Sequence, residues 1–296
     1  MTRFTANGNY CMTGSSDRSV KLWAPQRNVC IQTYTGPHNY DIFDLDIAAD
    51  NSRFVSGGGD KLVFVWDVQT AKPIRRFTGH AQRVKAVAWA AEATVVLSGS
   101  EDGTVKAWDC RSGDKEAVQT MKEARDSVSC VRAKDNCVVT SSLDGCLRTY
   151  DLRRGTLQSD EMRQPIHCFS LSTHDNCVLT SHQNSQLCIL DLHTGVVLSR
   201  YQGKHRAGDY RVYCALSIDS KRAFVGSEGR TVVGYSLAGE QEVVGEGHVD
   251  PVVAVDIHPK DALVAISGSL DTTARIWRIP SSEPIERLSS SVVDSA

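Results

Sequence analysis

Hydrophobic residues recur with a period of two over short stretches of this chain. Three such stretches follow one another at 84–89, 95–97 and 105–108. A period of two places successive side chains on opposite faces of a strand, whereas an amphipathic helix needs a period of 3.6. The pattern therefore predicts short β-strands and does not fit helices.

Turn residues separate the predicted strands. Asp102-Gly103 lies between the second and third strand of one group, and Asp144-Gly145 has the same position in the next group. A tight hairpin favours glycine for its positive φ and aspartate for its side-chain bond to the local backbone. After the third strand, a further stretch such as 73–77 leads to Gly79-His80. Each group is thus expected to contain four antiparallel strands.

One spacing of residues recurs seven times along the chain. A Ser, Thr or Val is followed four positions later by Asp, Asn or Gly, and after six more positions by Trp, Tyr or Leu. Successive repeats are 40 to 45 residues apart, which is the period of a four-stranded propeller blade. The sequence therefore predicts an all-β fold, a seven-bladed β-propeller with four-stranded antiparallel blades. The final positions of the repeats are Trp23, Trp66, Trp108, Tyr150, Leu190, Tyr235 and Trp277.

These repeats resemble those of the WD-repeat family. Trp-Asp occurs at 66–67 and 108–109, and Gly-His occurs at 79–80 and 247–248. Members of that family are β-propellers that serve many unrelated partners, so the resemblance implies the fold and leaves the partner open. We expect a single β-propeller over residues 1–288 and a loose tail over residues 289–296.

The two ends of the sequence bear on the first and last blades. Because the sequence begins at Met1, we expect the first blade to lack most of its inner strand, as in a truncated gene model or a product of an alternative start. Residues 284–288 resemble the predicted outer strand at 73–77 and are expected to complete the last blade. These ends matter because an uncovered strand edge exposes unpaired backbone groups.

Three repeats combine His, Ser, Asp and Trp in a set that imitates a hydrolase triad. The set recurs in parallel repeats with Trp as a fourth member, which argues against a single catalytic nucleophile. The family resemblance implies instead a structural network in which Asp accepts from His, His bonds Ser, and Ser accepts from the Trp indole. We therefore predict no catalytic residue and no enzyme. The sets are His38, Ser56, Asp60 and Trp66; His80, Ser98, Asp102 and Trp108; and His248, Ser267, Asp271 and Trp277.

The fourth, fifth and sixth repeats depart from this set. Ala124 occupies the His position of the fourth repeat, Leu190 replaces Trp in the fifth, and Gly229 replaces Asp in the sixth. We expect a thinner hydrogen-bond network and easier local opening in these three blades.

The charge balance argues against nucleic acid as a direct partner. The chain has 33 basic and 35 acidic residues and a formal net charge of −2. Its basic spots at 153–154 and 204–206 are local, whereas a nucleic-acid site needs a continuous stripe along the phosphates. We expect no direct contact with nucleic acid and no membrane partner.

Other features of the sequence narrow the class of protein. No apolar run reaches the roughly 18 residues of a membrane span, and no signal segment follows Met1. The ten cysteines and nine histidines are scattered, so we predict reduced thiols, no metal site and no cofactor. These features favour a protein that neither spans a membrane nor is secreted, and we expect it in the cytoplasm and nucleus, as a monomer within larger complexes.

A propeller without a catalytic site acts by displaying loops on a rigid scaffold. Tyr and Arg side chains anchor many protein interfaces, and several of them lie just before the predicted inner strands or near the hairpin turns. The predicted partner-binding residues are Tyr40, Asp41, Arg83, Glu101, Arg125 and Tyr210, together with Arg111 after a third strand.

Short sequence segments outside the repeat signature give a narrower resemblance, to one group within the family. The resemblance implies a scaffold that gathers components of an extracellular-signal-regulated kinase module and occurs with the spliceosome during pre-mRNA splicing. Kinase-module components and spliceosomal proteins are therefore the expected partners. The segments lie at 8–13, 56–61, 93–100, 108–112, 123–126 and 150–153.

A different short segment supports an alternative function. Trp108-Asp-Cys-Arg111 resembles the Trp-Asp-x-Arg pattern of substrate receptors in cullin-type ubiquitin ligases, and residues 150–153 form a weaker copy. In that interpretation Arg111 reaches a ligase adaptor, whereas in the simpler one it only caps a turn.

Overall fold

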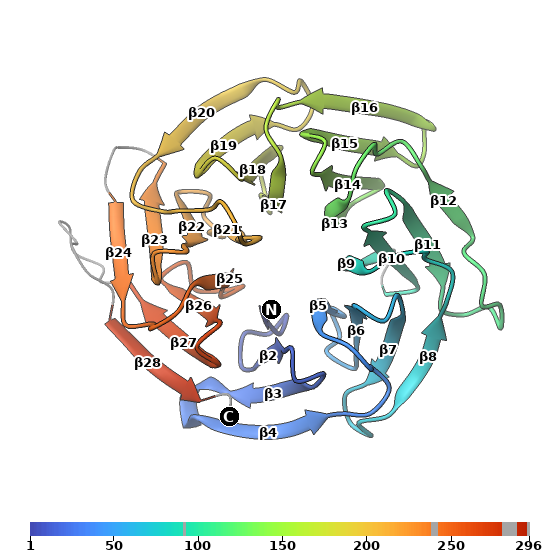
Figure 1. Cartoon of the computed structure of the whole chain (residues 1–296), viewed down its shortest axis with the longest axis horizontal. Coiled ribbons are helices and arrows are strands. Elements are labelled where there is room, and N and C mark those ends of the chain that lie inside the picture. The colour runs from blue at the N-terminus through green and yellow to red at the C-terminus, as the bar shows by residue number, and fades with distance from the viewer. Residues whose placement is uncertain (91–92, 238–241, 280–288, 295–296) are drawn as a thin grey trace. The chain divides into compact units, whose positions relative to one another are not determined.

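Regular structure in this chain is almost entirely β-sheet. The computed structural model describes residues 1–90, 93–237, 242–279 and 289–294. Seven four-stranded antiparallel sheets are present, each built from four strands that are consecutive in the sequence (Figure 1). One short 3-10 helix, η1, spans Pro25–Arg27. The fold is a seven-bladed β-propeller with four-stranded antiparallel blades, as the repeat spacing predicted.

The chain divides into two compact units. Unit 1 contains Met1 and residues 14–22 and 31–166, and unit 2 contains residues 2–13, 23–30 and 167–296. The domain boundary that we expect near residue 288 stays a prediction. The first sheet contributes residues to both units, and its strands are β1 (Thr2–Phe4), β2 (Cys11–Gly14), β3 (Val20–Ala24) and β4 (Val29–Tyr34).

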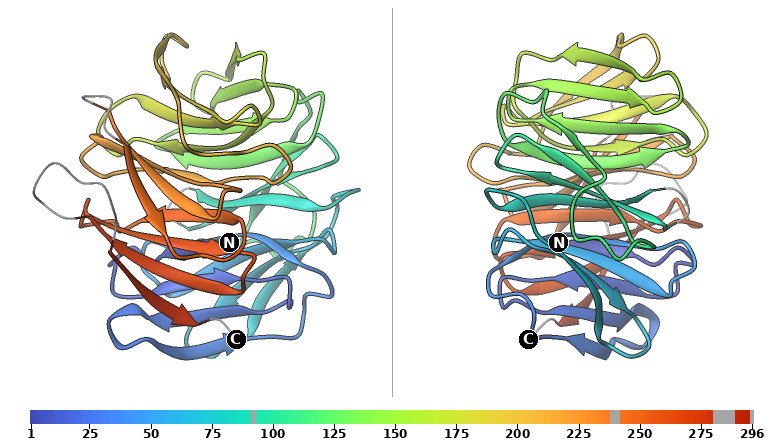
Figure 2. Two further views of the ribbon diagram at one scale, coloured as in Figure 1. Left: turned by 60° about the vertical axis from the view of Figure 1, so that its left-hand side comes forward. Right: turned by 90° about the vertical axis from the view of Figure 1, so that its right-hand side faces the viewer.

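The remaining strands form six sheets, which Figure 2 shows from two further directions. The strands of unit 1 are β5 (Ile42–Ile47), β6 (Arg53–Gly58), β7 (Val63–Asp67), β8 (Pro73–Phe77), β9 (Val84–Ala90), β10 (Val95–Ser100), β11 (Val105–Asp109), β12 (Gln119–Met121), β13 (Val128–Lys134), β14 (Cys137–Ser142), β15 (Cys146–Asp151) and β16 (Thr156–Glu161). The later strands are β17 (Ile166–Leu171), β18 (Cys177–His182), β19 (Gln186–Asp191), β20 (Val197–Gln202), β21 (Cys214–Leu216), β22 (Arg222–Gly226), β23 (Thr231–Ser236), β24 (Glu242–Glu246), β25 (Val252–Ile257), β26 (Val264–Ser269), β27 (Thr273–Arg278) and β28 (Ser289–Asp294).

The first strand of the first sheet is short. β1 has three residues, whereas β9 and β13, the first strands of two other sheets, have seven. It is held by a carboxylate, because Asp256 Oδ2 accepts the Phe4 backbone N–H at 2.8 Å and Oδ1 lies 3.4 Å from the Arg3 guanidinium. The first sheet therefore has four strands, and its inner strand is short.

The last sheet is completed by residues that we expected to be loose. Ser289–Asp294 forms β28 and pairs antiparallel with β27, from Arg278↔Ser289 to Thr273↔Asp294. This pairing gives the backbone groups along β27 a partner strand, which an unpaired edge would lack. The outer strand that we expected at 284–288 lies outside the described residues.

Close approach of neighbouring sheets explains a glycine in the second strand. A Cβ atom on Gly99 would lie 2.5 Å from Val128 Cγ1 and 2.8 Å from Val131 Cγ2 of the next sheet. Gly57 has the same relation to Val84 one sheet earlier, with a distance of 2.7 Å. Because carbon atoms cannot approach so closely, a side chain at either position would force the sheets apart.

The three His–Ser–Asp–Trp sets form buried hydrogen-bonded chains. The indole N–H of Trp66, Trp108 and Trp277 donates to the Ser Oγ of the same set at 2.8, 2.8 and 2.7 Å. The His Nε2 lies 2.8, 2.7 and 2.8 Å from that Oγ. The His Nδ1 lies 2.8, 3.1 and 2.8 Å from Asp Oδ2. Each chain ties the hairpin turn of one blade to the loop that precedes its first strand.

The charge states of these chains follow from burial and hydrogen bonding. Burial lowers the pKa of His80 and of His248 and outweighs the attraction of Asp102 and Asp271. Burial opposes ionisation of Asp102, but hydrogen bonds from Thr104 and from the Ala81 N–H hold its pKa at about 2. In the sets of His80 and His248, a neutral imidazole therefore lies beside an ionised aspartate near neutral pH.

Other residues replace the missing members in the middle repeats. In the fourth repeat, the Arg148 guanidinium lies 2.7 Å from Asp144 Oδ2 and donates to Ser142 Oγ at 2.9 Å. In the sixth repeat, His205 Nδ1 lies 2.7 Å from the hydroxyl of Tyr235, which stands in the Trp position. In the fourth and sixth repeats, the network we expected to thin is therefore rebuilt with different partners. Whether these blades open more easily stays a prediction.

His80→Ala is expected to lower the free energy of unfolding by about 1–3 kcal/mol. The substitution removes the hydrogen bonds to Ser98 Oγ and Asp102 Oδ2 inside the protein. Urea denaturation of the full chain measures the change. The control is His193→Ala, because His193 is exposed, and a midpoint for His80→Ala equal to that of the control would contradict the structural role.

Stability is expected to fall as the pH drops from 7 to 5. Burial lowers the pKa of His205 to about 4, and burial together with the Arg211 charge does the same for His167. The unfolded chain takes up protons below the ordinary histidine pKa of about 6.5, while the folded chain does so only nearer 4. At pH 5, His205 and His167 should each lower the free energy of unfolding by about 1–2 kcal/mol relative to pH 7. Urea denaturation midpoints measured between pH 7 and pH 5 test this prediction. The midpoint of His205→Gln should depend less on pH than that of the unaltered chain. A midpoint of the unaltered chain that does not change with pH would contradict the prediction.

Candidate protein interface

A β-bulge redirects one residue near the start of two neighbouring first strands. The register between β5 and β6 shifts between Ile42 and Asp44 and skips Phe43. The register between β9 and β10 skips Lys85 at the matching position. A bulged residue points away from the regular alternation of its strand. Here the two bulged residues meet, since the Lys85 ammonium lies 3.7 Å from the centre of the Phe43 ring.

An ion pair extends this contact to a predicted site residue. Lys85 Nζ lies 3.0 Å from Glu101 Oε1, and both side chains are partly exposed. The Glu101 backbone N–H donates to the Arg83 carbonyl oxygen at 3.0 Å. Glu101 thus neutralises Lys85 and fixes the backbone beside Arg83.

An open cavity of about 550 Å³ lies beside Phe43 in unit 1. Tyr40, Asp41, Phe43, Lys61, Arg76 and Arg83 contribute to its lining, and we call this set the Tyr40 surface. Tyr40 is 63% exposed although it is a large aromatic residue. The structure therefore brings together three of the residues that the sequence singled out: Tyr40, Asp41 and Arg83.

Hydrogen bonds fix the shape of the Tyr40 surface before any partner binds. Asp60 accepts the Asn39 N–H at 3.3 Å and the Leu62 N–H at 3.1 Å, besides its contact with His38. The Gly59 N–H donates to the Asp41 carbonyl oxygen at 2.8 Å. The loop that carries Tyr40 is therefore bound at both ends to the hairpin that carries Lys61. A preorganised surface loses less conformational entropy on binding.

The Tyr40 surface carries an excess of positive charge. Lys61, Arg76 and Arg83 are exposed cations, and Asp41 is the exposed carboxylate among the residues that define the surface. Asp60 also lines the cavity, but its carboxylate already contacts His38 and two backbone N–H groups. This local excess contrasts with the net charge of −2 of the whole chain. Electrostatic complementarity therefore favours an acidic partner segment.

The other predicted site residues lie in separate places. The Arg125 side chain is exposed, while its backbone N–H donates to Asp144 at 2.9 Å. Tyr210 belongs to unit 2, is 44% exposed, and its backbone N–H donates to Glu228 at 2.8 Å. The Arg111 side chain is 73% exposed and lies 3.4 Å from Asp109. Within unit 1, Arg111 and Arg125 are not among the described residues that line the cavity beside Phe43.

Sequence reasoning missed Phe43, Lys61 and Arg76. It considered residues before the inner strands and Glu101 in one hairpin turn, whereas Lys61 lies in another hairpin turn with a φ of 67° and Arg76 lies in the outer strand β8. The repeat alignment could have found Lys61 and Arg76, because it places the turn and the outer strand beside the loop that carries Tyr40. A bulge has no signature in the period-two pattern, so Phe43 could not be found in that way.

The remaining chemistry of the described residues is sparse. Ser98 is fully buried and its Oγ accepts the Trp108 indole N–H, so this hydroxyl cannot meet a substrate from solvent. Within residues 1–90, 93–237, 242–279 and 289–294, no group of three or more His, Cys, Asp or Glu side chains is placed to hold a metal ion. In the same residues no helix is long and apolar enough to cross a membrane.

Asp60→Ala is expected to loosen the Tyr40 loop. The variant removes the acceptor of the Asn39 and Leu62 N–H groups, so these two amides should exchange with solvent at least about tenfold faster. Hydrogen exchange followed by NMR measures the rates. Asp67→Ala serves as control because it frees the Thr70 N–H in a different turn. Unchanged protection of Asn39 and Leu62 would show that Asp60 does not hold the loop.

Comparison with known proteins supports this account of the chain. The model of the family described as "WD domain, G-beta repeat" matches residues 2–24, 28–67, 71–109 and 239–278. The matched stretches contain the repeats that end in Trp, and the intervening residues 110–238 contain those that end in Tyr or Leu.

Curated relatives agree with the narrower resemblance. The chain is 29% identical to "WD repeat domain-containing protein 83 homolog" of Dictyostelium discoideum, over 94% of this chain and 93% of that protein. It is 46% identical to "WD repeat domain-containing protein 83" of Homo sapiens, over 19% of this chain and 17% of the human protein, and 48% identical to that of Danio rerio, over 17% and 16%. The short sequence segments outside the repeat signature resemble this same protein. From its repeats, its fold and these similarities, the chain carries WD-type repeats in a seven-bladed β-propeller and is similar to WD repeat domain-containing protein 83.

Proposed function

We propose that this protein is a non-catalytic scaffold that binds other proteins through the Tyr40 surface. The observation that carries the proposal is the junction of Tyr40, Asp41 and Arg83 at one open cavity. An exposed tyrosine beside arginines has the composition of an interface hot spot. The hydrogen bonds of Asp60 hold this surface in one shape, which suits a docking platform.

The chemistry of the His–Ser–Asp–Trp sets supports a structural role in place of a catalytic one. A nucleophilic serine needs access to substrate and a free lone pair, yet Ser56, Ser98 and Ser267 are fully buried and each accepts an indole N–H. The three sets have nearly the same geometry, as expected for a repeated structural element.

Similarity to WD repeat domain-containing protein 83 supports a finer proposal. We infer that the chain gathers components of an extracellular-signal-regulated kinase cascade and associates with spliceosomal proteins during pre-mRNA splicing. A protein with both roles would occur in cytoplasm and nucleus, as a monomer within larger complexes. The net charge of −2 supports contact with spliceosomal proteins and argues against direct contact with RNA.

Arg111 supports the alternative of a substrate receptor for a cullin-type ubiquitin ligase. Its side chain is 73% exposed directly after β11, and its backbone N–H donates to Asp109 at 2.8 Å. An exposed guanidinium on a fixed turn can reach an adaptor. The same hydrogen bond also fits simple turn capping, so co-purification must separate the two.

Affinity purification of the tagged chain from nuclear and cytoplasmic extracts tests the proposal. We expect ribonuclease-resistant splicing factors in the nuclear fraction and kinase-module proteins in the cytoplasmic fraction. Tyr40→Ala combined with Arg83→Glu should reduce their recovery at least about tenfold, since loss of a hot spot costs 2 kcal/mol or more. Tyr10→Ala, at another exposed tyrosine, is the matched control.

Two outcomes would redirect the assignment. Full recovery of the partners with the double variant would remove the Tyr40 surface as the docking site. A cullin and its adaptor that are lost specifically with Arg111→Ala, without splicing factors, would establish the ligase function in place of the scaffold.

A further inference from the structure

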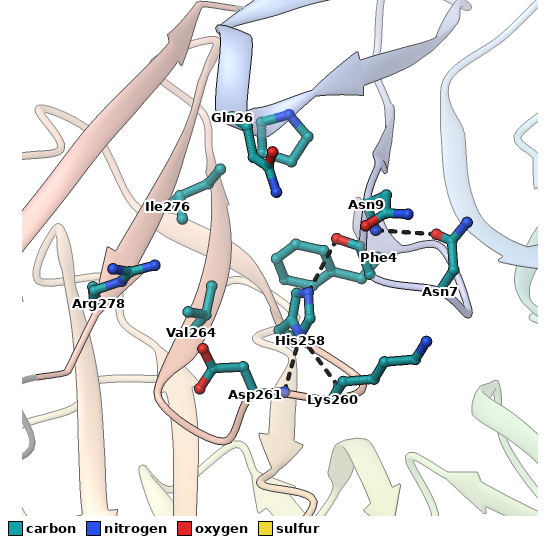
Figure 3. A pocket seen from close by; sticks show the side chains of 12 residues that line it. Phe4, Asn7, Asn9, Gln26, His258, Lys260, Asp261, Val264, Ile276 and Arg278 are labelled. Carbon is teal, nitrogen blue, oxygen red and sulfur yellow. Dashed lines mark hydrogen bonds between the residues drawn. The ribbon is translucent and has the colours of Figure 1, made fainter.

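A second open cavity lies in unit 2, on residues that the proposed function does not use. Its volume is about 690 Å³, within the range of protein sites that enclose small ligands or side chains. Figure 3 shows its lining, which includes Phe4 of β1, Gln26 of η1, His258 after β25, and Arg278 of β27. We call it the His258 pocket.

His258 forms a fixed wall of the pocket. Its Nδ1 accepts the backbone N–H groups of Lys260 at 3.2 Å and Asp261 at 3.0 Å. These two donors require a lone pair on Nδ1, so Nε2 carries the proton and donates to the Gly8 carbonyl oxygen at 3.1 Å. Both ring nitrogens are thus occupied within the protein, and the imidazole is not positioned to ligate a metal or to act as a base.

Packing against the imidazole keeps the pocket open in one shape. The Phe4 ring meets His258 edge to face, with 5.2 Å between ring centres. Gly8 has a φ of 79°, and a Cβ atom there would lie 2.2 Å from His258 Nε2, so the loop can lie against the ring because this residue is glycine. These contacts fix the shape of the pocket wall.

The pocket combines an apolar wall with a cationic rim. Phe4, Val264 and Ile276 supply apolar surface. Lys260 and Arg278 are exposed at the rim, and Figure 3 shows Arg278 on the side of Val264 and Ile276. Among the described residues Lys260 takes part in no ion pair within 4.0 Å. An apolar group can bury itself here while an attached acidic group meets the cations.

One carboxylate limits the kind of anion that fits. Asp261 lines the same pocket, and its Oδ1 accepts the Leu263 N–H at 3.0 Å. Among the described residues of the lining, the two cations outnumber this carboxylate, which favours one or two carboxylates over a run of phosphates. The apolar wall adds a requirement for a hydrophobic side chain that a phosphate backbone does not meet.

We propose that the His258 pocket is a second docking site, which binds a short acidic segment of a partner protein through one bulky aliphatic or aromatic side chain flanked by carboxylates. The hydrophobic side chain lies against Phe4, Val264 and Ile276, and a neighbouring Asp or Glu pairs with Lys260 or Arg278. This inference is independent of the Tyr40 surface, since the two cavities share no residue.

Fluorescence polarisation with synthetic peptides on the full chain tests the proposal. The probes are fluorescein-labelled heptapeptides Gly-Ser-Asp-X-Asp-Ser-Gly with Leu, Ile or Phe at X, a set with Lys in place of both Asp residues, and a set with Ala at X. The acidic hydrophobic set should bind at least tenfold more tightly than either other set. Raising the salt concentration should weaken binding, because exposed charge pairs are screened.

Variants at exposed positions assign the binding to the pocket. Lys260→Glu combined with Arg278→Glu should reverse the preference, so that the lysine peptides bind more tightly than the acidic ones. Gln26→Trp should reduce binding of both sets by placing an indole in the pocket. Since the three side chains are exposed, the fold should persist, which circular dichroism verifies. Tyr40→Ala with Arg83→Glu should leave peptide binding unchanged, which separates this test from that of the proposed function.

Several results would overturn the proposal. Equal binding of acidic and lysine peptides would remove the role of the cations, and equal binding of Ala peptides would remove the role of the apolar wall. A third such result is displacement of the labelled peptide by a uridine decamer from the unaltered chain but not from the variant with Lys260→Glu and Arg278→Glu. That result would assign the cationic rim of the His258 pocket to nucleic-acid binding. Absence of binding by every probe at about 1 mM would remove the site as a docking pocket.

Discussion

The structure depends on hydrogen bonds that let polar groups be buried between a hairpin and a loop. In three blades a Trp indole, a Ser hydroxyl, a His ring and an Asp carboxylate each find a partner within 3.1 Å. A buried polar group without a hydrogen-bond partner lowers the free energy of unfolding by more than most single contacts raise it. The four members of a set therefore stabilise the fold as a unit. Because the chain of bonds ends at the loop before the first strand, the same interaction that stabilises a blade also fixes the backbone that carries Tyr40.

The middle repeats show that the constraint is on hydrogen bonding and not on residue identity. Arg148 supplies from the third strand of its sheet the positive partner that Asp144 lacks in the loop, and Tyr235 supplies a hydroxyl where other repeats have an indole. In the sixth repeat Glu228 accepts the N–H groups of Gly208, Asp209 and Tyr210, so a carboxylate again holds the loop to a hairpin. A family model built on the Trp-containing pattern does not match these repeats, although they form the same sheets.

A structural feature could be predicted from the sequence when it leaves a signature in the repeated pattern of residues. The strands, the turns and the four-residue networks recur every 40 to 45 positions, so seven blades and the residues of each network could be derived. Features that leave no signature in the sequence pattern could not. β28 forms from Ser and Val residues that carry no clear strand signal. Bulges recur near the start of β5, β9, β13 and β25, but the one at Phe43 leaves the period-two pattern of β5 intact. The His258 pocket joins residues more than 250 positions apart through a tautomer that only the positions of the neighbouring N–H groups reveal.

The bulges at Phe43 and Lys85 have a consequence for how such a protein can change over evolutionary time. In a regular strand, each surface residue is bound by alternation to its buried neighbours, so insertion or loss of one residue moves the whole core face outward. A bulged residue stands outside that alternation. Its side chain can be exchanged while Asp44 and Leu45 keep their partners Gly57 and Ser56. The two positions that meet beside the Tyr40 surface are thus free to diversify recognition without disturbing the fold that presents them.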